Sequence, residues 1–300
     1  MHVFITGGTG FIGRALCQSL LAQGHTLTVL SRRPDAQVQA ICGQVGVVRA
    51  LADLTPTHRF DAVVNLAGEP IFGPPWTEKR KTILWDSRVT LTERLVAWIA
   101  QAETKPKVLV SGSAVGYYGD QGDQILDEAS PPVEKGFGQR LCAAWEAAAS
   151  AAEEHGVRVC RLRTGLVLGR DGGLLARMLP IFKLGLGGRL GRGRQWMSWI
   201  HLSDHVRITQ TLLGDDRLSG PFNACAPEPV TNAEFTQVLA RLIKRPACLP
   251  VPALAIRLAL GEMGELLLSS QRVYPKRLQE AGFAFQFPTL EAALKEVLAA

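Results

Sequence analysis

Three glycines near the start of the chain have the spacing of a phosphate-binding turn. The apolar residues 2–5 lead directly into Gly7, Gly10 and Gly13, and the amphipathic stretch 14–22 follows. A strand that ends in a glycine-rich turn and opens a helix brings backbone N–H groups and the positive helix end to a pyrophosphate. We expect Gly7 to permit the tight turn, Gly10 to permit close approach of the phosphates, and Gly13 to permit packing of the helix on the strand. This order of residues predicts a dinucleotide-binding site.

The end of the second predicted strand, 26–30, bears on the choice of nicotinamide cofactor. Ser31 and Arg32 follow this strand, at a position where NAD sites usually carry a carboxylate that binds the ribose 2′-hydroxyl. A 2′-phosphate instead prefers a guanidinium and a hydroxyl. The pattern favours NADP(H) over NAD(H), although Asp35 is close by. The alternative is that the arginines ahead of Pro34 only solvate a turn.

Three hydroxyl side chains follow the predicted strand 107–111 and could act on a substrate oxygen. They belong to Ser113, Tyr117 and Tyr118; a serine of this kind donates a hydrogen bond to the substrate oxygen in the superfamily that the chain resembles, and either phenol could donate a proton as a general acid. With no lysine nearby, we expect the pKa of either phenol to stay near 10. The alternatives are that Ser113 satisfies a turn and that the two tyrosines pack a loop.

Several arginines could hold anionic groups. Arg163, Arg189, Arg192 and Arg194 fall on or near the part of the chain that we expect to face a ligand. Two or three guanidiniums there could bind a second phosphate or a carboxylate of the substrate. The alternative is a solvated basic loop. Arg88 could reach the cofactor phosphates or point into water.

Two further groups of residues fit either chemistry or structure. His201 and Asp204 resemble a catalytic pair, but Asp204 is also well placed to cap a helix that starts near His205. We favour the structural role. Trp196 and Trp199 could stack on a base or sugar, although a tryptophan beside an apolar strand is more often part of the core.

The elements that must position these residues alternate between strands and helices. Near-continuous apolar strands between helices indicate a parallel sheet covered on both faces. The further expected elements are strands at 45–48, 60–68, 107–111 and 157–162, and long helices near 78–102 and 139–155. We therefore predict an α/β fold with a Rossmann-type doubly wound parallel sheet, with its ligand across the carboxyl ends of the strands.

A smaller C-terminal substrate lobe is expected after this sheet. Beyond Gly169 the sequence becomes glycine-rich at 185–194 and then continues as helices punctuated by prolines. We assign residues 1–169 to an NADP(H)-binding domain, to which residues 197–226 return. Residues 170–196 and 227–300 are assigned to the substrate-side lobe.

Composition narrows the class of protein. The chain has 300 residues, of which 47% are hydrophobic, and a net charge of +6 spread along its length. That charge suits a phosphate-bearing ligand, and no nucleic-acid-binding motif accompanies it. The six cysteines lack the pairing typical of disulfide frameworks or metal sites, so we expect neither. The chain begins within its first strand and has no apolar run of membrane-spanning length, which predicts a cytoplasmic protein with no membrane partner. The oligomeric state is not predicted.

Several motifs occur in the order seen in a known superfamily. They are Asn65-Leu66-Ala67-Gly68-Glu69-Pro70, Gly116-Tyr117-Tyr118-Gly119, Leu184-Gly185-Leu186-Gly187-Gly188, Leu249-Pro250-Val251-Pro252 and Ala281-Gly282-Phe283. With the glycine turn, they make the chain resemble the extended short-chain dehydrogenase/reductases. More narrowly, it resembles the YfcH-like epimerase-family proteins, which are sugar-nucleotide epimerase-like and carry a C-terminal domain of unknown function.

The resemblance implies a role for specific residues in binding NADP(H). By this analogy the pyrophosphate is held by the glycine turn and its two apolar neighbours, the 2′-phosphate by the end of the second strand, and the adenosine by the end of the fourth. The residues so implied are Gly7, Gly10, Phe11, Ile12 and Gly13, then Ser31 and Arg32, then Leu66 and Ala67. The backbone near Val167 would meet the nicotinamide.

The chain departs from the superfamily where chemistry is concerned. Typical members carry a Tyr-x-x-x-Lys pair whose lysine and cofactor lower the pKa of the phenol. Phe137 and Leu141 stand at these two positions here, and Arg140 falls one residue early, about 100° around the helix. We expect an atypical oxidoreductase or epimerase-like enzyme that acts on a small carbonyl or a sugar-nucleotide-like substrate. The alternative is a catalytically degenerate NADPH-binding sensor or regulatory protein.

Overall fold

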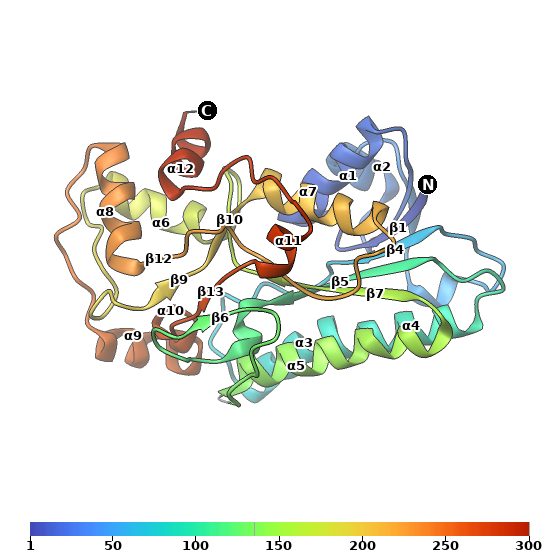
Figure 1. The fold of residues 1–300 in the computed structure, drawn as a ribbon, viewed down its shortest axis with the longest axis horizontal. Helices are drawn as coiled ribbons and strands as arrows, with labels where there is room; N and C mark the ends of the chain where they lie inside the picture. Colours follow the sequence, from blue (N-terminus) through green and yellow to red (C-terminus); the bar gives the residue numbers. More distant parts are fainter. Residues whose placement is uncertain (135, 300) are drawn as a thin grey trace.

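A seven-stranded parallel sheet forms the centre of the computed structural model, which describes residues 1–134 and 136–299 (Figure 1). In spatial order its strands are β3 (Gly46–Val48), β2 (Thr26–Leu30), β1 (His2–Thr6), β4 (Ala62–Asn65), β5 (Val108–Ala114), β7 (Arg158–Thr164) and β11 (Gly220–Ala224). The order runs outward in both directions from β1, so the predicted doubly wound α/β fold is confirmed.

Helices cover both faces of this sheet. The upper face in Figure 1 carries α1 (Phe11–Ala22), α2 (Asp35–Cys42) and α7 (Leu202–Gly214). The lower face carries α3 (Glu78–Trp85), α4 (Leu91–Gln101) and α5 (Gly136–Ser150). Consecutive residues of β1 point to opposite faces: Val3 and Ile5 pack in the core under α1 and α7, whereas Phe4 packs in the core under α4. This arrangement explains why the strands are apolar throughout.

Several elements differ from their predicted bounds, since β5 extends to Ala114 and the helix expected near 139–155 ends at Ser150. For two others the reason is identifiable. The helix expected at 78–102 is interrupted by a π turn, η2 (Asp86–Thr90). At this turn the Thr92 hydroxyl donates a hydrogen bond to the Arg88 carbonyl over 2.6 Å, a side-chain bond that competes with the regular helix. The strand expected at 60–68 ends at Asn65. The Leu66 N–H still donates to the carbonyl of Thr6, but the Ala67 N–H donates to the Thr6 hydroxyl and the main-chain pairing with β1 stops there.

The C-terminal part of the chain forms a second core beside the sheet. Its helices α6 (Gly173–Lys183), α8 (Asn232–Ile243) and α12 (Leu290–Leu298) pack around Trp199 and Phe235. Small sheets accompany them: β8 (Leu166–Leu168) pairs with β10 (Trp199–His201), and β9 (Trp196–Met197) pairs with β12 (Val230–Thr231). The remaining lobe elements are α9 (Ala253–Leu260), η5 (Gly261–Gly264), α10 (Glu265–Leu268), β13 (Arg272–Val273) and α11 (Lys276–Glu280).

The two parts are tied together at the carboxyl edge of the sheet. β13 of the lobe pairs with β6 (Ile125–Leu126), which follows β5 and the turn η3 (Val115–Tyr118). Two other short helical turns, η1 (Leu51–Asp53) and η4 (Ala151–His155), lie in connections of the sheet. Among the described residues, none of the helices combines the length and apolar character needed to cross a membrane.

Candidate functional site

The glycine turn between β1 and α1 forms a cradle that side chains would fill. Gly7 has a φ of +73°, and a Cβ there would lie 2.6 Å from the Leu66 carbonyl. A Cβ on Gly13 would lie 2.2 Å from the Gly7 oxygen. Gly10 is exposed, and a Cβ there would meet only the Gly7 oxygen, at 3.2 Å. The cradle at the N-terminus of a twelve-residue helix therefore fits a pyrophosphate.

A buried polar network fixes the neighbouring strand ends. The sheet register places Thr6, Asn65 and Ser111 side by side on β1, β4 and β5. The Thr6 hydroxyl donates to Asn65 Oδ1 over 2.7 Å, and Asn65 Nδ2 donates to Thr92 over 2.8 Å and to Ser111 over 3.2 Å. Trp145 Nε1 also donates to the Thr92 hydroxyl, over 3.1 Å. Helices α4 and α5 are thereby anchored to the edge where a ligand would bind.

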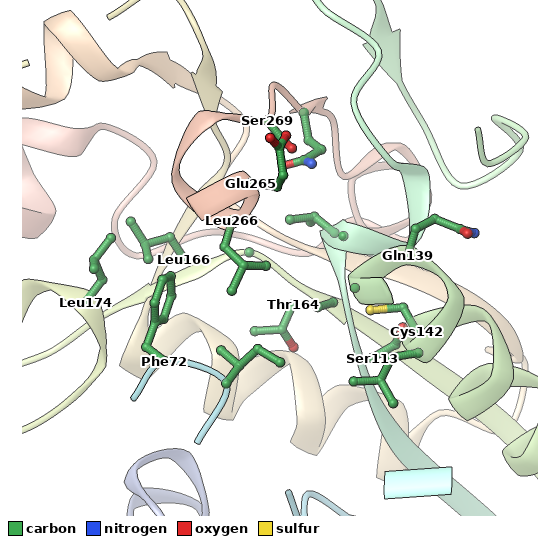
Figure 2. Close-up of a pocket in the computed structure, with 18 of the residues that line it drawn as sticks. Phe72, Ser113, Gln139, Cys142, Thr164, Leu166, Leu174, Glu265, Leu266 and Ser269 are labelled. Atoms are coloured by element: carbon green, nitrogen blue, oxygen red, sulfur yellow. The ribbon is translucent and has the colours of Figure 1, made fainter. Parts of the chain in front are cut away.

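A cavity of about 640 Å³ runs from the glycine cradle into the C-terminal lobe, a volume in the usual range for ligand sites. Figure 2 shows Phe72, Leu166 and Leu174 on one side and Ser113, Gln139 and Cys142 on the other. The predicted site residues that line it are Gly7, Gly10, Phe11, Ile12, Gly13, Leu66, Arg88 and Ser113. The structure thus brings the predicted phosphate turn and the predicted substrate hydroxyl into one cavity.

The end of β2 lies beyond this cavity lining but presents the predicted groups. Ser31 is buried at the strand end, where its Oγ accepts a hydrogen bond from the Arg33 N–H over 3.2 Å. Arg32 is exposed and makes no ion pair among the described residues. Asp35 pairs with Arg49 over 2.7 Å. The carboxylate that could have indicated NAD(H) is therefore engaged elsewhere, while the Arg32 guanidinium is available.

Three other predicted cofactor residues have defined positions. The Ala67 N–H donates to the Thr6 hydroxyl over 3.2 Å, and Val167 pairs with Ile200 between β8 and β10; neither residue lines the cavity. Arg88 does line it, yet its guanidinium donates to the Glu69 carbonyl over 2.9 Å and lies over the Trp145 ring. Arg88 is thus turned toward the cavity and not into water.

Ser113 is backed by a buried ion pair. Its hydroxyl donates to Glu146 Oε1 over 2.7 Å. Arg163 holds the same carboxylate with two bonds, Nε to Oε1 over 2.8 Å and Nη2 to Oε2 over 2.9 Å. All three side chains are buried. Because its proton is directed to Glu146, the Ser113 oxygen has lone pairs available on its cavity side.

The two tyrosines lie outside the cavity lining. Tyr118 is fully buried, donates to Asn223 Oδ1 over 2.7 Å and accepts from Arg163 Nη1 over 2.9 Å. Burial raises the pKa of Tyr118 above its ordinary value despite the opposing effect of Arg163, so the expected value near 10 is wrong for this phenol. The Tyr117 ring lies against the Arg163 guanidinium, 3.6 Å from ring centroid to Cζ. Both rings pack around Arg163, and the structure does not bring either phenol to the cavity.

Apolar residues occupy the positions of the absent Tyr-x-x-x-Lys pair. Phe137 and Leu141 both line the cavity from α5. Cys142 lies beside them, and burial raises the pKa of its thiol to about 12. This thiol is therefore neutral near pH 7 and is poorly suited to act as a nucleophile.

His201 and Asp204 hold the fold together. α7 starts at Leu202, and His201 Nδ1 accepts the Ser203 N–H, so the prediction that Asp204 caps a helix starting near His205 is wrong. Asp204 instead accepts the N–H groups of Gln286 and Phe287, each over 2.9 Å. The carboxylate thereby fixes the segment that leads to α12.

The tryptophans and arginines of the lobe divide between core and surface. Trp199 is fully buried, whereas Trp196 lines the cavity. Arg163 is engaged in its buried ion pair and is not part of a solvated loop. Arg192 and Arg194 line a second cavity of about 340 Å³ next to the first, while the exposed Arg189 lines neither.

Glu146 is the main site residue that the sequence reasoning missed. A signal was present, because Glu146 follows Gln139 and Cys142 by seven and four residues, a spacing that places all three on one face of α5. A single carboxylate among the alanines of this face needs a buried partner. That partner, Arg163, comes from a distant strand and could not be paired with it from the sequence. Among the described residues there is no group of three or more potential metal ligands.

Comparison with known families accounts for this combination of fold and cradle. Residues 3–225 match the model described as the NAD dependent epimerase/dehydratase family. The chain belongs to this family. Residues 251–297 match a second model, described as a domain of unknown function, DUF1731. The predicted resemblance to epimerase-family proteins with such a C-terminal domain is confirmed.

Relatives of this epimerase-family chain cover nearly its whole length. The epimerase family protein Mb2239 of Mycobacterium bovis is 44% identical over 97% of this chain and 96% of its own length. The human epimerase family protein SDR39U1 is 38% identical over the full length of both chains. A crystal structure of that human protein (isoform 2) with NADPH has a TM-score of 0.90 at 36% identity, covering 100% of this chain and 99% of its own.

Proposed function

We propose that this chain binds NADP(H) and acts as an atypical oxidoreductase of the epimerase family on a carbonyl or alcohol substrate. The observation that carries the proposal is that the glycine cradle lines the same cavity as Ser113, whose hydroxyl donates to the buried Glu146. The exposed Arg32 and the Asp35–Arg49 pair favour a cofactor with a 2′-phosphate. NADPH in the structure of a human relative at 36% identity supports the same choice.

When bound, NADP(H) supplies the hydride chemistry, and the chain supplies position and a proton path. In the direction of alcohol oxidation, the substrate hydroxyl donates to Ser113 Oγ. Its proton passes to Ser113 as the Ser113 proton passes to Glu146 Oε1. Reduction uses the reverse path and starts from protonated Glu146, which returns its proton through Ser113 to the substrate oxygen. Arg163 compensates the charge of Glu146 while this carboxylate is ionised. The serine and the carboxylate thereby take over the proton handling that a phenol and a lysine perform in typical members.

The test is single-turnover oxidation of bound NADPH with a panel of aldehydes and ketones. Replacing Ser113 by alanine should slow turnover by about a hundred- to ten-thousandfold, the usual contribution of positioned acid–base groups, and leave NADPH affinity unchanged. Ser269→Ala is the matched control, since Ser269 lines the same cavity but does not contact Glu146. That control should change the rate by less than about tenfold. Equal rates in the wild type and Ser113→Ala would contradict the proposed role.

A second candidate function is an NADPH-dependent sensor that has lost catalysis. It is favoured by one observation: Phe137 and Leu141 line the cavity where the superfamily has its catalytic pair, and neither tyrosine of the η3 turn reaches it. Tight NADPH binding with no turnover on any member of the panel, together with a partner whose association changes with NADPH, would favour this function.

A further inference from the structure

The far part of the cavity is bounded by an apolar wall. Three segments contribute to it: the loop after β4, the start of α5, and α10. The members of this apolar wall are Ile71, Phe72, Trp76, Phe137, Leu141 and Leu266. They pack in one hydrophobic cluster, in which the Trp76 and Phe137 rings meet edge to face with their centroids 5.2 Å apart. Figure 2 shows Leu174 of α6 near Phe72.

Two backbone carbonyls of this wall accept hydrogen bonds from side chains of the protein itself. Trp76 Nε1 donates to the Ile71 carbonyl over 3.1 Å, and Arg177 Nη2 donates to the Phe72 carbonyl over 3.3 Å. These bonds hold the loop after β4 in place. Hydrocarbon and aromatic surface is therefore what the wall presents to a ligand.

The charges beside this apolar wall do not suit a second diphosphate, in addition to the pyrophosphate that the glycine cradle fits. Within the described part of the chain, its charged lining residues are Arg88, Asp120, Glu262 and Glu265. Arg88 is the single cation among them, and its guanidinium is already bonded to the Glu69 carbonyl. Glu262 pairs with Lys81 over 2.7 Å. A diphosphate bound against the wall would lose water without gaining a new cation, at a cost of several kcal/mol per charge by general estimates.

The arginines that could have bound an anionic substrate lie elsewhere. Arg163 is neutralised by Glu146 behind Ser113. Arg192, Arg194 and Arg257 belong to the neighbouring smaller cavity, whose lining also includes Asp120 and Asp123. The sequence-based expectation of an anionic substrate thus finds little support at the apolar wall.

We infer that the substrate is an uncharged, predominantly apolar ketone, aldehyde or secondary alcohol, and not a nucleoside diphosphate sugar. Its hydrocarbon part lies against the apolar wall and its oxygen lies at Ser113. The inference rests on the proposed function, since it names the substrate class of that same site. In the reductive direction the substrate carbonyl carbon gains hydride from NADPH and its oxygen gains a proton through Ser113, giving an alcohol and NADP⁺.

The probe for this inference is Prodan, a neutral naphthyl ketone whose fluorescence reports an apolar environment. We expect it to bind the NADPH-loaded protein, and we expect UDP-glucose neither to bind nor to displace it. Leu266→Asp places a charge in the wall and should weaken Prodan binding by about tenfold or more. Leu258→Asp is the matched control, because Leu258 is 79% exposed on α9. It should leave Prodan affinity unchanged.

Two further measurements keep the outcomes distinct. NADPH affinity is titrated separately, and Prodan binding is also measured without cofactor. Phe72→Ser provides a second, uncharged change in the wall if Leu266→Asp does not fold, and it should also weaken Prodan binding. Three results would overturn the inference while NADPH still binds: Prodan fails to bind, both wall variants bind Prodan with wild-type affinity, or UDP-glucose displaces Prodan. Loss of NADPH binding with Prodan binding retained would instead overturn the proposed function.

Discussion

One continuous chain of buried hydrogen bonds runs from Ser113 through Glu146, Arg163 and Tyr118 and ends at Asn223. Only Ser113, at its opposite end, lines the cavity. Charge-assisted bonds inside a protein are strong when every member is satisfied, and costly when one partner is removed. The same chain can therefore serve both stability and proton handling, and mutations at its two ends separate these roles.

Tyr118→Phe should reduce stability and leave cofactor binding unchanged. The substitution deprives Asn223 Oδ1 of its donor and Arg163 Nη1 of an acceptor. The expected loss is about 1–3 kcal/mol in the free energy of unfolding. Urea denaturation measures it, and Tyr274→Phe is the control, since Tyr274 is 37% exposed. A Tyr118→Phe variant with unchanged stability but abolished turnover would instead identify Tyr118 as a catalytic acid.

The sequence predicts the role of a single residue when that role depends only on the backbone next to it. Gly7, Gly10 and Gly13 act through a turn between adjacent elements, so their spacing alone indicates the cradle. The position of Ser113 follows similarly from the predicted strand, although β5 extends past it to Ala114. The burial of Tyr118 could not be predicted, because its partner Asn223 is 105 residues away.

The cradle is an element-scale feature, since it exists only where β1, α1 and the end of β4 meet. Gly10→Val should fold normally, because a Cβ there meets only the Gly7 oxygen at 3.2 Å. It should weaken NADPH binding by about tenfold or more, which corresponds to about 1.4 kcal/mol, because the side chain occupies the space of the pyrophosphate.

Calorimetry measures this loss, and circular dichroism verifies the fold. Gly214→Val is the matched control, since a Cβ on Gly214 at the end of α7 meets nothing within 4 Å. Unchanged NADPH affinity in a folded Gly10→Val variant would show that the pyrophosphate binds elsewhere.

Helix α7 should make stability depend on pH through His205. Complete burial lowers the pKa of His205 from 6.5 to about 4. The unfolded chain then binds a proton below pH 6.5 that the folded chain does not bind until about pH 4. Stability should fall as pH falls through this window, by up to about 1.4 kcal/mol per pH unit from this group.

His205→Gln should flatten this part of the pH profile, because glutamine does not titrate and can still reach Thr164, which His205 Nε2 contacts over 3.0 Å. Denaturation series from pH 6.5 to 4 compare the wild type with this variant. His155→Gln, at the end of η4, serves as the control. Parallel profiles for the wild type and His205→Gln would contradict the assignment.

Element types were more predictable than element ends. The sequence predicted six of the seven strands of the sheet, all except β11, because burial on both faces imposes a largely apolar composition. The π turn at Asp86–Thr90 and the end of β4 lie where Asn65 donates to Thr92 and accepts from Thr6, two bonds that belong to tertiary structure. The cap of α7 was missed for a similar reason, since the C-terminal segment near Phe287 recruits Asp204.

At the scale of the whole molecule, the cavity lies between the sheet and the C-terminal lobe. The sheet contributes the cradle and Ser113, and the lobe contributes Leu174, Leu266 and Trp196. A ligand that spans this cavity contacts both parts. The lobe is the region least predictable from sequence, because its short strands and helices take their positions from contacts with β6 and with the glycine turn, where Phe11 packs against the start of α6.

In the proposed function the cavity binds NADP(H) in preference to NAD(H), and calorimetric titration with NADPH and with NADH measures this preference. We expect NADPH to bind the wild type more tightly than NADH by about ten- to a hundredfold, the equivalent of about 1.5–3 kcal/mol for charge-assisted bonds to the 2′-phosphate. Arg32→Ala should remove this preference, while Arg94→Ala, an exposed change on α4, should retain it. Equal dissociation constants for the two cofactors, or an unchanged preference in Arg32→Ala, would show that Arg32 does not select NADP(H).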